Sequence, residues 1–223
     1  MKTIEIGGKR VHLFAPDGPV RLNIWTHMQK DEAAALSVQA GEGVALFAAD
    51  DYDWNADLSP WPAKACFKGG DDFAGKAPER LKWLVQAVPL AEAELPGVQN
   101  APRALLGYSL AGLFAVWAMG ECDVFGCAAS VSGSLWYDGF LGHLQERAAC
   151  FAGKAVYLSL GDREAKTRNP RLACVQEAAE AARDVLSAAG ARCVFELNPG
   201  NHFHDPTGRC ARAAAWLAQE TVV

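Results

Sequence analysis

Residues 103–112 read Arg-Ala-Leu-Leu-Gly-Tyr-Ser-Leu-Ala-Gly, and the interpretation of the whole chain starts from them. The apolar residues up to position 107 predict a short buried strand, and the apolar run at 110–119 predicts a helix packed centrally against a sheet. Between them Ser109 has small residues two positions before it and two and three positions after it. Small residues let a strand and a helix approach closely around a strained turn. The stretch therefore predicts Ser109 at the carboxyl edge of a sheet, directly before a helix.

A serine in this setting is typical of a catalytic nucleophile. The helix N-terminus and the amide of Leu110 are suited to stabilise an oxyanion beside it. A nucleophilic serine needs a base and the base needs an orienting acid, which on this kind of turn follow in the order Ser, acid, His. Glu164 follows the strand expected at 155–159, and His202 follows the strand expected at 194–197. We predict Ser109, Glu164 and His202 as a catalytic triad.

Two alternatives to this assignment stay open from the residues alone. Asp162 lies in the same Gly-Asp-Arg-Glu stretch and is the reserve acid, although the Gly-x-x-acid spacing favours Glu164. His202, His204 and Asp205 also form a pattern from which a zinc site is conceivable. A third histidine with recognisable spacing is missing from the sequence, so we predict no metal and no cofactor.

Short apolar runs alternate with longer helical stretches, which is the signature of an α/β protein with a mostly parallel sheet. The expected strands lie at residues 11–14, 21–26, 44–48, 103–107, 127–132, 155–159 and 194–197. The expected helices lie at residues 77–88, 110–119, 171–189 and 209–217. Pro89 is expected to kink or end the first of these helices.

Composition narrows the class of protein. The chain has 223 residues, 51% of them hydrophobic and 21% charged, which suits one folded domain spanning 1–223. Its formal charge is −5 and no basic run is longer than Lys9-Arg10, so neither nucleic acid nor a membrane surface is an expected partner. The N-terminal residues lack the pattern of a secretory signal, and we expect a cytoplasmic protein.

Several aromatic residues fall in or beside the loops expected at the catalytic edge. Residues 51–75 form a long stretch without a helical or strand period, and a loop of that length is usually functional or disordered. We predict that a set of aromatic residues binds an aromatic part of a substrate: Trp54, Trp61, Trp136, Tyr108 and Tyr137. Packing of the loops onto their own domain is the alternative interpretation.

Three motifs together resemble a known esterase group. They are Gly107-Tyr-Ser-Leu-Ala-Gly-Leu-Phe114, Ser130-Val-Ser-Gly-Ser-Leu-Trp136 and Asp53-Trp-Asn-Ala-Asp-Leu-Ser-Pro-Trp-Pro62. Across about residues 25–217 the chain is similar to the α/β-hydrolase fold, and within it to enterochelin-type siderophore esterases, feruloyl esterases and esterase D. The resemblance implies Ser109 as nucleophile, His202 as general base and acid, and Glu164 as the acid that orients it. It also implies the Leu110 amide as one oxyanion donor.

The chain departs from that group in three places. Ala111 stands where glycine is commoner, which a small side chain tolerates. The group's second oxyanion donor follows a His-Gly dipeptide, whereas this chain has Trp-Thr-His-Met at 25–28, so we expect the backbone of His27, or of Met28, to serve. About 20 residues separate Ser134 from the strand expected at 155, too few for a large cap domain.

The sequence therefore predicts a serine hydrolase that cleaves small-molecule carboxylic esters through an acyl-enzyme intermediate. A thioesterase or another acyl hydrolase is the alternative within the same chemistry. A catalytically silent α/β-hydrolase fold that acts as a binding protein is the alternative of a different class. The natural substrate and the oligomeric state stay open.

Overall fold

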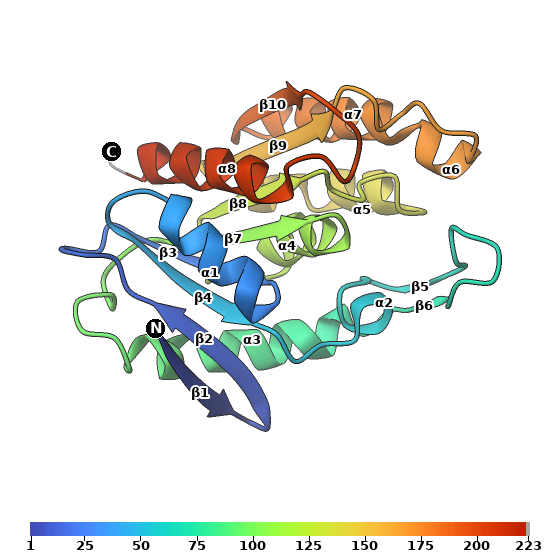
Figure 1. The fold of residues 1–223 in the computed structure, drawn as a ribbon. Coiled ribbons are helices and arrows are strands. Elements are labelled where there is room, and N and C mark those ends of the chain that lie inside the picture. The colour runs from blue at the N-terminus through green and yellow to red at the C-terminus, as the bar shows by residue number, and fades with distance from the viewer. Residues whose placement is uncertain (222–223) are drawn as a thin grey trace.

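The computed structural model describes residues 1–221, and a central sheet of eight strands dominates it (Figure 1). The strand order is β1-β2-β4-β3-β7-β8-β9-β10. The strands are β1 (Lys2–Ile6), β2 (Lys9–Phe14), β3 (Leu22–His27), β4 (Val44–Ala49), β7 (Arg103–Tyr108), β8 (Cys127–Val131), β9 (Ala155–Gly161) and β10 (Arg192–Asn198). The pairings of β1 with β2 and of β2 with β4 are antiparallel. The six strands from β4 to β10 in this order run parallel, which confirms the predicted mostly parallel sheet.

Helices cover both faces of the sheet, as the burial of the parallel strands requires. They are α1 (Lys30–Gln39), α2 (Trp54–Asp57), α3 (Ala77–Glu92), α4 (Leu110–Glu121), α5 (Phe140–Glu146), α6 (Pro170–Ala173), α7 (Val175–Ala188) and α8 (Pro206–Glu220), with a 3-10 turn at Ala148–Phe151. One hydrophobic core cluster draws on α3, α4 and α7, and a second, on the other face, draws on α1 and α8. Figure 1 shows α1 and α8 side by side on that second face.

The long segment after β4 is ordered and joins a second segment near the end of the sheet. It contains α2 and a small hairpin of β5 (Pro62–Ala63) and β6 (Phe73–Ala74). The Asn169 side chain donates to the carbonyl of Cys66 at 2.6 Å, and Arg171 donates to the carbonyl of Lys64 at 2.6 Å. These bonds tie α6 to the hairpin, and the two lie on the same side of the molecule in Figure 1.

The structure differs from the sequence expectations at several elements, and α2, α5 and the β5–β6 hairpin are among those that the sequence does not predict. Strand β1 and helix α1 were not predicted, because β1 is a largely exposed edge strand and α1 buries only Ala33 and Leu36. Helix α3 continues through Pro89 to Glu92, since Ala91 beyond the proline is fully buried in the core and holds the last turn. The helix expected at 171–189 is interrupted at Cys174, between α6 and α7.

Nothing between Met1 and Thr221 is both helical and sufficiently long and apolar to cross a lipid bilayer. Over the same residues the carboxyl edge of the sheet carries loops, short helices and the β5–β6 hairpin, and no large cap domain. This agrees with the short connection expected between β8 and β9.

Candidate active site

Ser109 lies on the tight turn between β7 and α4. Its φ of 57° and ψ of −120° put a non-glycine residue in a sparsely populated region of backbone space. The turn is held by neighbouring strands and loops, because the Ser109 amide donates to the carbonyl of Val131 at 3.0 Å and the amide of Ser134 donates to the Ser109 carbonyl at 3.0 Å. The strain is thus stabilised from outside the turn, and the hydroxyl is presented at the carboxyl end of β7.

The small residues around Ser109 have a direct steric reason. A Cβ atom on Gly107 would lie 2.0 Å from the carbonyl oxygen of Ala111, and one on Gly112 would lie 2.8 Å from the hydroxyl of Ser130. Real Cβ atoms do not approach other atoms this closely, so the strand and helix fit together only with glycine at these positions. Ala111 itself is accommodated with 2% of its surface exposed.

His202 lies between Ser109 and Glu164. Its Nε2 is 3.1 Å from the Ser109 hydroxyl oxygen, and its Nδ1 is 2.7 Å from Oε2 of Glu164. An ionised carboxylate only accepts hydrogen bonds, so Nδ1 carries the proton that Glu164 accepts and Nε2 is left to accept the serine proton. The three side chains therefore form one directed chain of hydrogen bonds from hydroxyl to imidazole to carboxylate.

Glu164 is buried and heavily hydrogen-bonded. Its side chain is only 4% exposed, and its second oxygen, Oε1, accepts from the Gly161 amide at 2.6 Å and from the Ser132 hydroxyl at 2.7 Å. Burial favours the neutral acid, but the bonds from His202, the Gly161 amide and Ser132 outweigh it and lower the pKa of Glu164 below its ordinary value. The carboxylate is accordingly ionised and oriented at neutral pH.

Asp162, the reserve acid, points elsewhere. Its carboxylate accepts a hydrogen bond from the Gly200 amide at 2.8 Å, and its side chain is 54% exposed. The four-residue turn in which the Glu164 amide donates to the Gly161 carbonyl brings Glu164, and not Asp162, to His202.

Ser109, His202 and Glu164 open onto a cavity of about 610 Å³. Leu110 and His27, the residues expected to supply oxyanion amides, are part of its wall. Most of the other lining residues are apolar or aromatic: Met28, Leu36, Tyr52, Trp54, Phe67, Phe73, Tyr108, Trp136, Leu172, Val175 and Phe203. A mostly apolar cavity beside a few convergent polar groups is the usual form of a small-molecule site.

Comparison of the sequence with known proteins gives no family for the chain. No family model matches the chain. The uncharacterized protein YbbA of Bacillus subtilis (strain 168) is 29% identical over 116 residues, which are 50% of this chain and 46% of YbbA, so the match spans about half of that relative.

Two solved structures are similar over almost the whole chain. An IroE-like serine hydrolase from Shewanella oneidensis superposes with a TM-score of 0.78 at 16% identity, over 95% of this chain and 76% of that one. The siderophore hydrolase EstA from Aspergillus nidulans superposes with a TM-score of 0.73 at 19% identity, over 95% of this chain and 90% of that one. The chain has the α/β-hydrolase fold.

Within the α/β-hydrolase fold of this chain, a buried arginine joins the loops that carry the acid and the histidine. The Arg209 side chain, 0% exposed, donates to Oε1 of Glu164 at 3.0 Å and to the Ser132 hydroxyl at 2.9 Å. It also donates to the carbonyls of Pro199 and Asn201, at 2.9 and 3.0 Å, in the loop that bears His202. The sequence predicts Arg209 only as the start of a helix, because an arginine on a helix is normally exposed.

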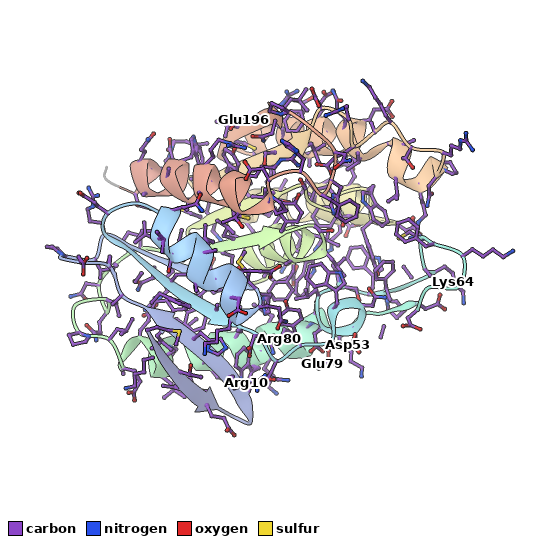
Figure 2. The ribbon with its side chains drawn as sticks, in the orientation of Figure 1. Arg10, Asp53, Lys64, Glu79, Arg80 and Glu196 are labelled. Carbon is purple, nitrogen blue, oxygen red and sulfur yellow. The ribbon has the colours of Figure 1, made fainter. Side chains whose placement is uncertain are left out.

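His27 is anchored by a second buried arginine. The Nε2 atom of His27 accepts a hydrogen bond from Nε of Arg80 at 2.8 Å, and the guanidinium of Arg80, on α3 (Figure 2), lies over the Trp83 ring at 4.2 Å. Burial, aided by the positive charge of Arg80, lowers the pKa of His27 well below its ordinary value, so the imidazole is neutral. This pair fixes the end of β3 beside the cavity.

Only some of the aromatic residues expected to bind substrate line the cavity. Trp54, Trp136 and Tyr108 line the cavity, and the Tyr108 hydroxyl also donates to the carbonyl of His202. Trp61 is not among the lining residues; its indole donates to the carbonyl of Asp138 at 2.9 Å, and its ring packs against Tyr137. Trp61 therefore holds two loops together, which is the packing alternative.

Two lining aromatics were missed in the sequence analysis. Phe67 is 63% exposed and Phe203 is 84% exposed, and both border the cavity at its opening to solvent. Phe203 directly follows His202, and this position was the only signal available in the sequence.

The zinc alternative does not fit the structure. Across residues 1–221 no three His, Cys, Asp or Glu side chains are grouped so that they could hold a metal ion. Asp205 instead caps α8 by accepting from the Gly208 amide at 3.1 Å, while His202 is engaged with Glu164.

Proposed function

We propose that this chain is a serine hydrolase that cleaves carboxylic esters through Ser109, His202 and Glu164. The observation that carries the proposal is the hydrogen-bonded chain from Ser109 to His202 to Glu164 at the edge of an apolar cavity. Similarity in fold to a serine hydrolase and to a siderophore hydrolase supports it further.

In the first half of the reaction, the Ser109 hydroxyl attacks the ester carbonyl while Nε2 of His202 takes its proton. The negative charge on the carbonyl oxygen is stabilised at the N-terminus of α4 by the Leu110 amide, with a backbone amide at His27 or Met28 as the second donor. Collapse of the tetrahedral intermediate breaks the bond to the alcohol, which takes the proton from His202. The product on the protein is the acyl ester of Ser109.

In the second half, water attacks the acyl-enzyme and gives one proton to His202. The carboxylic acid leaves as the proton returns to the Ser109 oxygen, so the chain is regenerated with one water consumed. Glu164 stays ionised throughout and stabilises the imidazolium that forms in each half. We expect no cofactor in this cycle.

The first test is hydrolysis of p-nitrophenyl acetate and butyrate by the wild type and by Ser109→Ala and His202→Ala. We expect each variant to lose about 10³-fold or more in kcat. Thr3→Ala is the matched control, because Thr3 also bonds to a histidine, His12, at 2.9 Å, but on β1, outside the cavity lining. Turnover that survives Ser109→Ala would exclude the mechanism.

A leaving-group series distinguishes the thioesterase alternative. We propose oxygen esters as the substrate class, and the same acyl groups offered as oxygen esters and thioesters measure that preference directly. If the folded wild type turns over neither and Ser109 does not react with a fluorophosphonate, the silent binding protein becomes the better account.

A further inference from the structure

Apart from the histidines, the acidic and basic residues that line the cavity are all carboxylates. Glu32, Asp71 and Glu164 belong to its wall, and none of its lining residues within 1–221 is a lysine or an arginine. The two histidines of the wall are His27 and His202. A substrate in this cavity therefore meets carboxylates, imidazoles and apolar surface.

Only part of that negative charge is compensated. Glu164 forms its ion pair with the buried guanidinium of Arg209 at 3.0 Å, so its charge is largely offset inside the protein. His27 is neutral, since burial holds its pKa well below the ordinary value. Glu32 and Asp71 are exposed, so the residues that line the mouth of the cavity carry net negative charge.

Three basic residues of neighbouring segments, Lys64, Arg171 and Arg80, are directed to other partners. Lys64, on the segment after β5 (Figure 2), bonds to Asp72 at 2.8 Å. Arg171 pairs with Asp138 at 2.8 Å, and its guanidinium lies over the ring of Trp136 at 5.4 Å. Arg80 lies behind the cavity wall, where it bonds to His27 and to the carbonyl of Asp51.

The free energy of entering this cavity therefore depends on the charge of the ester. An anionic group that enters an apolar cavity loses hydration without gaining a cationic partner, and the carboxylates repel it. A cationic group loses hydration too, but it is attracted by the carboxylates and by the face of an aromatic ring such as that of Trp54. A neutral aromatic group gains from burial alone.

We infer that the cavity selects neutral and cationic aromatic esters and discriminates against esters that carry an anionic group near the scissile bond. This inference rests on the proposed function, because it specifies the substrate of the same site. Its structural basis is the absence of lysine and arginine from the described wall, together with Glu32 and Asp71 at the mouth.

The test uses three aryl acetates that differ in the charge of one para substituent: 4-acetoxybenzoate, 4-acetoxybenzamide and 4-acetoxy-N,N,N-trimethylanilinium. Each kcat/KM is divided by the rate constant for alkaline hydrolysis of the same ester, which removes intrinsic reactivity. We expect the neutral ester to exceed the anionic one by about tenfold, and the cationic ester to equal or exceed the neutral one. Added salt should reduce these ratios.

Variants locate the origin of the preference. In a double variant, Glu32→Gln with Asp71→Asn, the ratio of neutral to anionic ester should fall severalfold toward one. The matched control is Asp123→Asn, which removes an exposed carboxylate before β8, at the opposite end of the strands. Equal rates for the anionic and neutral esters in the wild type would overturn the inference, and so would equal effects of the control and the double variant.

Failure of the proposed function would be recognised separately. If the neutral ester is not hydrolysed at all, the hydrolase assignment fails, and the charge preference is then measured by binding. Calorimetry on Ser109→Ala with 4-hydroxybenzoate, 4-hydroxybenzamide and 4-hydroxy-N,N,N-trimethylanilinium should give the weakest binding for the benzoate. Binding of the benzoate as tight as that of the amide would contradict the inference independently of turnover.

Discussion

The guanidinium of Arg209 lies 3.0 Å from the carboxylate of Glu164, and both side chains are withdrawn from solvent, with 0% and 4% of their surfaces exposed. The same guanidinium bonds to two carbonyls of the loop that carries His202. A single side chain thus fixes the acid and the histidine relative to one another. Its planar fork of donors suits this task, whereas a lysine supplies one nitrogen only.

We therefore predict that Arg209→Lys lowers kcat for p-nitrophenyl butyrate by about 10²-fold while KM stays near its wild-type value, because the histidine loop shifts relative to Glu164. Arg212→Lys on the same helix is the control; Arg212 bonds to Asn198 at 2.9 Å and not to the triad. Steady-state kinetics at a temperature where all variants are folded checks this. A wild-type kcat in Arg209→Lys would show that the contact is only structural.

Arg209→Met should behave differently from the lysine variant, because it leaves Glu164 buried without its ion-pair partner. Loss of one partner of a buried pair costs about 3–5 kcal/mol of folding free energy. Urea denaturation measures this cost, and activity in the lysine variant must exceed activity in the methionine variant. The reverse order would contradict a positioning role.

The choice between the two acids can be tested directly. We predict that Glu164→Gln lowers kcat by about 10³-fold or more, because the amide no longer orients and stabilises the histidine as a carboxylate does. Asp162→Asn should retain kcat within about threefold, since an amide oxygen still accepts the Gly200 proton. If Asp162→Asn shows the large loss of kcat and Glu164→Gln the small one, Asp162 is the acid. The hydrogen bond from His202 to Glu164 is then not the functional one.

The close contact at Gly107 predicts a steric effect on folding. Gly107→Ala puts a Cβ atom 2.0 Å from the Ala111 carbonyl oxygen, so the strand and helix must separate. We expect a loss of about 2 kcal/mol or more in the free energy of unfolding, together with loss of activity. Gly126→Ala is the control, because its Cβ atom would meet nothing within 4 Å. Equal stability of the two variants in urea would disprove the account of the turn.

The His27–Arg80 contact predicts a pH dependence of stability. His27 stays neutral in the folded protein, because burial and Arg80 lower its pKa, whereas in the unfolded chain it binds a proton below its ordinary pKa of 6.5. The unfolded state then binds more protons, so stability falls as pH falls below about 6.5, by up to about 1.4 kcal/mol per pH unit. His27→Gln, which still accepts from Arg80, should lose this slope. The free energy of unfolding of both proteins is measured in urea at pH 7.5, 6.5 and 5.5. An equal change with pH in the wild type and in His27→Gln would reject the prediction.

Local spacing was sufficient to predict the parts of the site that depend on backbone geometry. The turn around Ser109 requires glycine at two positions, and the turn from Gly161 to Glu164 returns the carboxylate to the Gly161 amide. Both requirements are visible in a few consecutive residues. The fold class followed from the alternation of strands and helices and is confirmed; the catalytic roles stay predictions.

Contacts between distant segments were not predictable in the same way. Arg209 is buried because three loops converge on it, and nothing in the helix around it marks this. Trp61 lies in an aromatic loop like Trp54, yet the backbone directs one to Asp138 and the other into the cavity wall. Helix α1 was not predicted because it buries only Ala33 and Leu36, which are too few to give a clear apolar period.

The measurement that tests the central claim most directly is labelling of the folded protein with a fluorophosphonate, followed by mass spectrometry of the intact chain and of its peptides. The account predicts one adduct per chain, located on Ser109, absent from Ser109→Ala and strongly slowed in His202→Ala. An adduct on a different residue, or a folded wild type that remains unlabelled while an active serine esterase in the same tube is labelled, would contradict it.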